Sequence, residues 1–376
     1  MSETTGTRSS MIDVLKGTII IAVVFLHIGF SKHDDVGSPG ILIQAMYLGL
    51  MAFFIISGYF CKPERGFVCN MKKRVKQLLI ILILCAVVLP VIQFCWLCIL
   101  GQAPDLDDFV LALQWGFGLN ELFMPLGSPK VYPLCGSAVG YYFIWAMLFA
   151  FVIFYAFIGY VIDSKKKLAA MILILLAITV LECEFCRYRM PFYLELAPLS
   201  SAFMFAGAGL AKFNLIGKIE GLLKGKKESI LLLAISLICG AVLLLLFPPG
   251  INFDILLLGD HGGLSTLPYF LESVFMCIVF LYISSLVSKI PVLLNILTEA
   301  GKHTLGILMY HGFVASMIIA TFCPLTTTSW FPADLTMAQR IPLAFGTLII
   351  CYVICKFGPA VVTKVTNPIL NHDDKL

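Results

Sequence analysis

Two ionisable side chains, Lys16 and His27, stand eleven residues apart in the first long apolar segment of the sequence. Eleven residues make about three turns of an α-helix, so an uninterrupted helix would place both side chains on one face, about 16 Å apart. Ionisable groups inside a membrane segment are costly and are typical of functional sites. The spacing therefore predicts a cation near one membrane surface and an imidazole deeper in the bilayer.

An imidazole at this depth has two interpretations. His27 could make a structural hydrogen bond to a neighbouring helix, or it could act as a general base, because histidine titrates near neutral pH. The presence of Lys16 on the same predicted face favours the general base. Lys16 itself could bind an anionic ligand, extend to the lipid headgroups, or pair with Asp13 at the i, i+3 spacing.

Other polar groups in apolar or membrane-adjacent segments could act with His27. His311 stands nine residues after Lys302, about 13 Å into a later segment, and is either a second catalytic imidazole or a contact between helices. Glu272, near the outer end of another segment, has either a structural role or a role as a partner of the histidines or a ligand of the acceptor. A basic cluster containing Lys73 and Arg74 could dock a polyphosphate, attract anionic lipid or set the topology.

The segment FFIISGYF, residues 53–60, places a small polar step in an otherwise bulky apolar helix. Small residues such as Gly58 allow membrane helices to approach closely, which favours a structural role for this step. Ser57 and Tyr59 are also candidates for the lining of a substrate pocket.

The composition assigns the chain to the integral membrane proteins. Of its 376 residues, 60% are hydrophobic and 13% are charged, whereas soluble domains carry about 25% charged residues. No segment has the alternating pattern of a barrel strand, so we predict an all-α, polytopic membrane helical bundle. The first segment holds charged residues and lacks a small-residue cleavage site, so it is expected to be a span and not a signal peptide. The ten predicted spans are residues 12–30, 41–60, 77–100, 137–161, 168–182, 197–213, 229–247, 267–287, 303–322 and 339–362.

The distribution of Lys and Arg predicts that both termini are cytoplasmic. With the N-terminus inside, most basic residues fall in inner loops, as the positive-inside rule requires. The net charge of +4 comes from these loops and gives no reason to expect nucleic acid as a partner. The outer loops receive only Lys32, Lys130, Arg187, Arg189 and Arg340.

We expect one domain over residues 1–376, with no appended soluble domain. The longest connection, residues 101–136, is predicted to be an outer loop, either a surface loop or a lid over a site. Most of the 13 cysteines lie in apolar segments, where they act as small hydrophobes. Cys183 and Cys186 could be oxidised together, although separate structural roles are the simpler interpretation. No cluster has the spacing of metal ligands, so no metal site is predicted.

These motifs, in this order, resemble the integral membrane acyltransferase 3 family over nearly the whole chain. The signature of a basic residue, ten intervening residues and a histidine is met by Lys16 and His27. The step of basic residues before the third span is met by Lys73 and Arg74. Two further signatures, FF-x-x-SG-[YF] and G-K-x-[ST]-L followed by a histidine, are met by Phe53, Phe54, Ser57, Gly58 and Tyr59, and by Gly301, Lys302, Thr304, Leu305 and His311.

The resemblance implies an O-acyltransferase in the inner (plasma) membrane of a bacterium. Such enzymes move an acyl group, most often acetyl, to a hydroxyl of a cell-surface or envelope glycan. The expected donor is cytoplasmic acetyl-CoA or another acyl-CoA, and the expected partners are membrane lipid, the glycan acceptor and polysaccharide-assembly proteins. In this hypothesis Lys16, Lys73 and Arg74 bind the donor, His27 and His311 are catalytic, and Ser57, Tyr59 and Glu272 line the substrate pocket.

A membrane transporter of a small polar solute or an acylated product is the alternative. Transport sites are often built from paired, interrupted helices in matching halves of a chain, and this sequence shows no such symmetry. It also has few carboxylates inside the predicted spans for ion coupling. A scaffold within a glycan-synthesis complex is a third interpretation.

Overall fold

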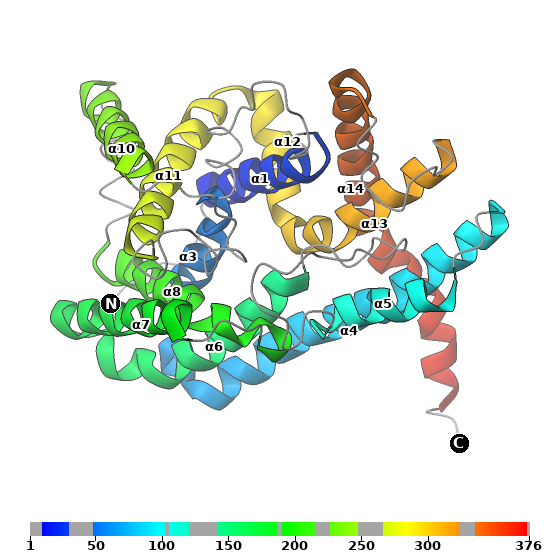
Figure 1. The fold of residues 1–376 in the computed structure, drawn as a ribbon, viewed down its shortest axis with the longest axis horizontal. Helices are drawn as coiled ribbons and strands as arrows, with labels where there is room; N and C mark the ends of the chain where they lie inside the picture. Colours follow the sequence, from blue (N-terminus) through cyan, green and yellow to red (C-terminus); the bar gives the residue numbers. More distant parts are fainter. Residues whose placement is uncertain are drawn as a thin grey trace.

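The structure, a computed structural model, describes residues 10–29, 48–101, 105–119, 141–185, 190–214, 226–246, 266–322 and 335–373. Within these ranges every regular element is a helix, which confirms the predicted all-α class (Figure 1). The α-helices are α1 Ser10–Val24, α3 Ala52–Tyr59, α4 Gly66–Ile99, α5 Leu106–Gly116, α6 Tyr141–Val161, α7 Lys165–Phe185, α8 Ala197–Lys212, α10 Lys226–Leu246, α11 Thr266–Val287, α12 Pro291–Lys302, α13 Thr304–Phe322 and α14 Met337–Asp373. A π-helical turn, η1 Phe25–Gly29, and two 3-10 turns, η2 Pro63–Arg65 and η4 Pro191–Leu196, complete the set.

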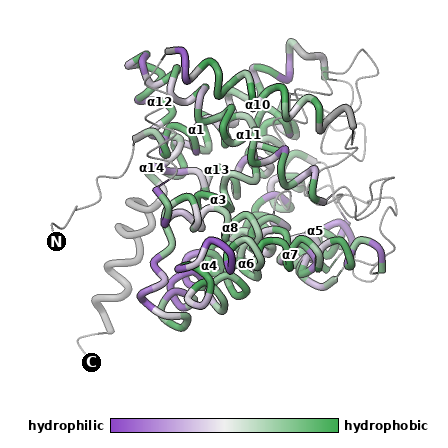
Figure 2. Tube along the Cα trace, turned by 90° about the vertical axis from the view of Figure 1, so that its left-hand side faces the viewer, coloured by the Kyte–Doolittle hydropathy of each residue, from purple (hydrophilic) through white to green (hydrophobic). Residues whose placement is uncertain are grey.

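Eight helices in the described ranges are long and apolar enough to cross a membrane. The second and seventh predicted spans coincide with two shorter apolar helices, Leu48–Tyr59 and Ile230–Val242. Most of the helical trace is hydrophobic, and hydrophilic residues gather in short stretches (Figure 2). The protein is therefore a multi-pass integral membrane protein, while the direction in which the chain crosses the bilayer stays a prediction.

The helices form two packed groups that divide the sequence unevenly. Helices α3 to α8 pack on one another, and α1 packs with α11, α12, α13 and α14 from the far end of the chain (Figure 1). The groups meet where α4 contacts α13 and where α11 contacts α3 and α7. At the first of these contacts the Gln93 side chain donates a buried hydrogen bond of 2.9 Å to the Ser316 hydroxyl. This arrangement brings the first span beside the last ones.

The contact between α1 and α12 depends on two glycines. A Cβ atom at Gly17 would overlap the carbonyl oxygen of Leu297, and one at Gly301 would overlap the carbonyl oxygen of Asp13. Each helix thus places its glycine against the backbone of the other. Small residues allow this close approach in membranes, where van der Waals packing drives helix association.

The contact between α3 and α8 is built in the same way. A Cβ atom at Gly58 would overlap the carbonyl oxygen of Met204, and one at Gly207 would overlap that of Ile55. The close helix approach predicted from the Ser57-Gly58 step is therefore confirmed.

Two helices were not predicted. Helix α5 occupies part of the expected outer loop 101–136, so the prediction of a loop was wrong for those residues. Its start is stabilised because Asp105, at the N-cap, accepts a hydrogen bond of 2.8 Å from the Asp108 backbone amide. Its end packs on α6, where the Trp145 indole donates to the Gly116 carbonyl oxygen at 3.2 Å. Helix α12 occupies the expected connection between the eighth and ninth predicted spans and begins with Pro291 in its first turn.

Candidate active site

The centre of the candidate site is a contact between the two histidines that the sequence singled out. Nδ1 of His27 lies 3.0 Å from Nε2 of His311. The two rings are nearly parallel, with centroids 5.0 Å apart and an interplanar angle of 19°. His27 is half-buried, whereas His311 has no exposed surface. The structure thus brings together two imidazoles separated by 284 residues in the sequence.

The position of His27 depends on a change of helix type. The α-helical part of the first span ends at Val24, and His27 lies in the π-helical turn η1. A π-turn is wider than an α-turn and is often found at functional sites. Phe25, in the same turn, packs edge-on against Phe345 of α14, with ring centroids 5.1 Å apart. The uninterrupted α-helix assumed for the Lys16–His27 spacing therefore does not extend to His27.

His311 is held by its own helix. Its Nδ1 atom lies 2.7 Å from the Leu308 carbonyl oxygen and 3.2 Å from that of Ile307. Helix α13 is fixed in turn by the Gln93–Ser316 hydrogen bond to α4. The orientation of the His311 ring is therefore fixed by contacts within the protein.

Lys16 lies in α1 and forms an ion pair with Asp13. Its Nζ atom is 2.8 Å from Asp13 Oδ1, and the carboxylate is almost fully buried. Of the three roles considered for Lys16, the structure shows the i, i+3 pair. A role of Lys16 in donor binding stays a prediction. The ion pair with Asp13 leaves less positive charge on Lys16 for binding a phosphate group.

The basic cluster lies in the first part of α4. The exposed side chains of Lys72, Lys73 and Lys76 point away from the packed core, while Arg74 is half-buried. The Arg74 guanidinium lies over the Phe151 ring of α6, 4.7 Å from its centroid, a favourable cation–π arrangement. This contact could not be predicted from the sequence, because it joins two different spans.

The three predicted pocket residues lie on other helices. Ser57 and Tyr59 are half-buried on α3, which packs mainly against α8. Glu272 lies on α11, which contacts α1, and is 1% exposed. Its Oε1 atom has no hydrogen-bond partner among the described residues. A buried polar atom without a partner is costly, so Glu272 fits the predicted role of ligand-binding residue, which stays a prediction.

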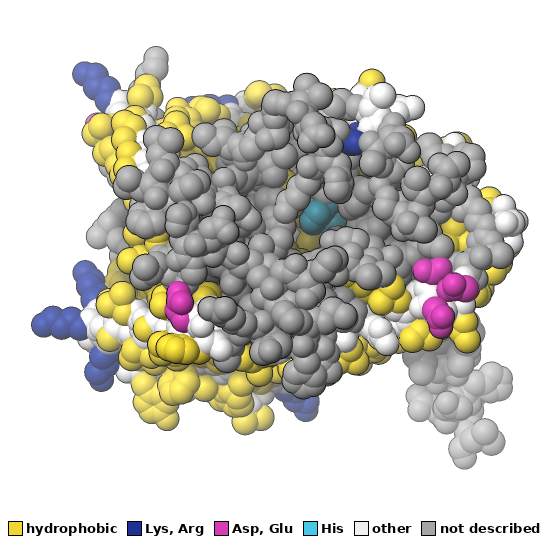
Figure 3. Space-filling model, viewed as in Figure 1, with side chains coloured by type: hydrophobic (Ala, Val, Ile, Leu, Met, Phe, Trp, Pro, Cys, Tyr) yellow, Lys and Arg dark blue, Asp and Glu magenta, His cyan; other side chains and the backbone are white. Residues whose placement is uncertain are grey.

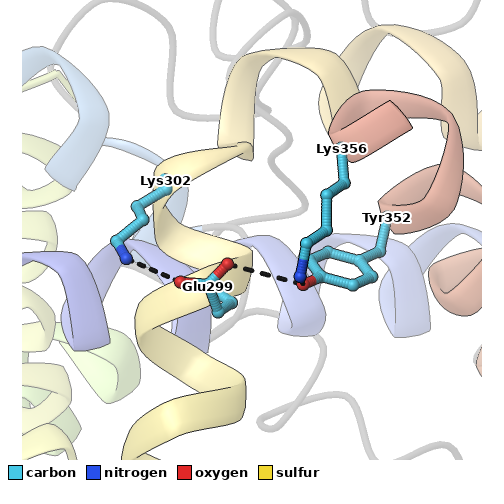
Figure 4. Close-up of polar contacts among 4 residues, drawn as sticks. All are labelled: Glu299, Lys302, Tyr352 and Lys356. Atoms are coloured by element: carbon cyan, nitrogen blue, oxygen red, sulfur yellow. Dashed lines mark hydrogen bonds and ion pairs between the residues drawn. The ribbon is translucent and has the colours of Figure 1, made fainter. Parts of the chain in front are cut away.

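A second polar network, which the sequence did not reveal, joins α12 to α14 (Figure 4). Lys302 Nζ donates to Glu299 Oε1 at 2.6 Å, and the Tyr352 hydroxyl donates to Glu299 Oε2 at 3.4 Å. Lys356 Nζ lies 2.7 Å from the Tyr352 hydroxyl. The hydrogen bond from Lys302 lowers the pKa of Glu299. Lys302, from the late sequence motif, therefore has a structural role in this network.

A histidine side chain is visible near the centre of the face drawn in Figure 3. A neutral imidazole can accept a proton, and a second imidazole at hydrogen-bond distance can orient it. Within the described ranges, no group of three or more His, Cys, Asp or Glu side chains could hold a metal ion. The His27–His311 contact fits acid–base chemistry on a substrate.

A family model described as an acyltransferase domain, that of the acyltransferase 3 family, matches residues 10–356. This range begins with α1 and ends within α14, so it includes both histidines. No curated protein and no solved structure gives a significant match to the chain. The chain belongs to the acyltransferase 3 family of membrane acyltransferases.

Proposed function

We propose that the protein transfers an acetyl group from cytoplasmic acetyl-CoA to a hydroxyl of an envelope glycan, with His27 as the general base. The family match supports acyl transfer, and the resemblance in the sequence supports acetyl-CoA and a glycan. The assignment of the catalytic residues rests on the contact between His27 and His311. These are the residues that the family resemblance and the intramembrane position both pointed to.

The chemical step needs one base and no change of oxidation state. His27 removes the proton from the acceptor hydroxyl while the hydroxyl oxygen attacks the thioester carbonyl carbon. The carbon–sulfur bond then breaks, and the proton passes from His27 to the CoA sulfur. The products are an acetyl ester and free CoA. A positioned base of this kind contributes a rate factor of about 10² to 10⁴.

The exposed basic cluster in the first part of α4 supports a binding site for the acyl donor at that end of the helix. Phosphate groups bind well to Lys and Arg, and Arg offers paired donors to phosphate oxygens. Lys73 is exposed, and Arg74 is partly ordered by the Phe151 ring. In the proposal these two residues bind the phosphates of CoA. Lys16 adds positive charge to the same site, reduced by its ion pair with Asp13.

The acceptor is proposed to meet the acetyl group at the bundle itself. Glycan hydroxyls donate hydrogen bonds to carboxylates, and the Oε1 atom of Glu272 offers such an acceptor. Ser57 and Tyr59 would complete the lining with hydroxyl groups.

The test is acetyl transfer by purified protein in liposomes supplied with labelled acetyl-CoA and extracted envelope glycan. The His27→Ala variant should lose about 10² to 10⁴ in the rate of transfer. His303→Gln is the matched control, because His303 lies between α12 and α13 and packs edge-on against Tyr352, outside the histidine pair. Unchanged transfer by correctly folded His27→Ala protein contradicts the proposal.

The same assay separates an enzyme from a transporter. An acyltransferase releases free CoA in step with ester formation, whereas a transporter moves its solute and leaves the thioester intact. Liposomes that take up solute without consuming acetyl-CoA would exclude the proposed reaction.

A further inference from the structure

The hydrogen bonds of His311 determine which of its nitrogen atoms carries a proton. Carbonyl oxygens only accept hydrogen bonds, and Nδ1 of His311 lies 2.7 Å from one and 3.2 Å from another. Nδ1 must therefore carry a hydrogen and donate it. The opposite arrangement would point a nitrogen lone pair at two carbonyl oxygens in a region without exposure to water, which is unfavourable.

The proton on His311 in turn determines the proton on His27. A neutral imidazole with a hydrogen on Nδ1 has a lone pair on Nε2. Nε2 of His311 lies 3.0 Å from Nδ1 of His27, so His27 must carry its hydrogen on Nδ1 for this contact to be a hydrogen bond. The result is a directed chain, in which His27 donates to His311 and His311 donates to the Leu308 carbonyl oxygen. The basic nitrogen of neutral His27 is then Nε2.

We infer that His311 is a positioning residue that makes Nε2 of His27 the nitrogen that takes the proton of the acceptor hydroxyl. This inference rests on the proposed function, because it assigns an atom to the same step. As the new carbon–oxygen bond forms, the hydroxyl proton moves to His27 Nε2, and it later passes to the CoA sulfur when the carbon–sulfur bond breaks. The hydrogen on Nδ1 of His27 stays on that nitrogen throughout and remains hydrogen-bonded to Nε2 of His311.

His311 has the role here that a buried carboxylate has in a Ser-His-Asp triad. There, a carboxylate holds the tautomer of the histidine and stabilises the imidazolium. Here, His311 accepts the hydrogen bond from His27, and the Leu308 carbonyl oxygen polarises His311 from behind. In the proposed arrangement both imidazoles are neutral before the reaction, so the pair avoids the large cost of burying a lasting charge inside a membrane protein.

The proton positions can be measured by nitrogen NMR of the full-length protein in liposomes, with ¹⁵N-labelled histidine. Protonated and unprotonated ring nitrogens give separate signals, and spectra of His27→Gln and His311→Gln assign them. At neutral pH we expect both residues to carry their hydrogen on Nδ1. A hydrogen on Nε2 of His27 in the wild-type protein would overturn the inference.

Kinetics give an independent readout from two substitutions at one position. His311→Gln keeps an oxygen that can accept the hydrogen bond from His27, whereas His311→Leu does not. We expect kcat to fall on the order of 10² in the Leu variant and less in the Gln variant, with KM for acetyl-CoA unchanged in both. Equal losses in two folded variants, or a change confined to KM, contradict a positioning role.

The two proposals fail in different ways. Normal transfer by His27→Ala contradicts the proposed function whatever the tautomer. Loss of transfer in His27→Ala together with a hydrogen on His27 Nε2 leaves the proposed function standing and refutes the inference. If the Leu variant does not fold, the tautomer measured in the wild-type protein still decides.

Discussion

Glu299 illustrates how single side chains hold α12 and α14 together. Its two carboxylate oxygens accept hydrogen bonds from Lys302 and Tyr352, and the bond from Lys302 lowers its pKa (Figure 4). A carboxyl group with a lowered pKa in the folded state stabilises that state above the pKa of the unfolded chain. This stabilisation is lost as the pH falls through the pKa of the folded state.

The Glu299→Gln variant should therefore show a pH-dependent defect. We expect its Tm at pH 7 to lie about 1–3 °C below that of the wild-type protein, because a partly exposed ion pair contributes little. The difference should shrink as the pH falls below about 4. Thermal unfolding in nanodiscs measures both effects. Asp163→Asn is the control, since the Asp163–Lys212 pair is more exposed and should matter less. A difference that persists in acid would show that charge is not the cause.

Arg74 allows a test of the donor site at a single position. Replacing it with Gln removes a cation and should raise KM for acetyl-CoA about 10-fold, with kcat little changed, because the lost contact is to the bound donor and not to the reacting atoms. Initial rates over a range of acetyl-CoA concentrations measure both constants.

Lys165→Gln is the control for Arg74, because Lys165 also lies over an aromatic ring, 5.1 Å from the Phe213 centroid, but belongs to α7. Equal effects of the two substitutions would remove the support for a phosphate site on α4.

At the scale of whole helices, the α1–α12 contact positions the first span and everything on it. Gly301→Ala would drive a methyl group into the backbone of α1 at Asp13. Overpacking of this kind costs about 1–3 kcal/mol. Because α1 leads into the turn that carries His27, we also expect reduced acetyl transfer.

Thermal unfolding and the liposome assay measure the two effects of Gly301→Ala. Gly159→Ala, on α6, is the matched control, because a Cβ atom there meets nothing within 4 Å. If both glycine variants behave like the wild-type protein, the close contact does not hold α1 in place.

At the scale of the molecule, helix α4 offers a measure of how the chain crosses the bilayer. Cys69 and Cys98 are both exposed and lie near its opposite ends. Their separation along a straight helix is about 44 Å, close to the full thickness of a membrane.

With the N-terminus inside, a single-cysteine variant retaining Cys69 should react with a membrane-impermeant maleimide only from the cytoplasmic side. A variant retaining only Cys98 should react only from the outside. The reverse pattern would invert the predicted topology.

The features that the sequence determined are those that depend on local composition. Hydropathy identified the membrane class and the positions of the spans, since a bilayer requires long apolar helices whatever their packing. Residue type and spacing also singled out His27 and His311 as candidate catalytic groups, and the ordered motifs identified the family. Helix α5 was missed because its stabilising contacts, such as the Trp145 bond to Gly116, come from another span.

The tertiary structure alone decided which of these residues meet. Nothing in the order of spans requires the first and the ninth to be neighbours, because helix packing depends on the shapes of whole faces and on close contacts such as that of Gly301 with α1. The sequence likewise contains no sign that the first helix widens at Phe25–Gly29 before it presents His27. A hydrogen bond between two imidazoles is a matter of a few tenths of an ångström, and such distances are set only when all the packed helices are in place.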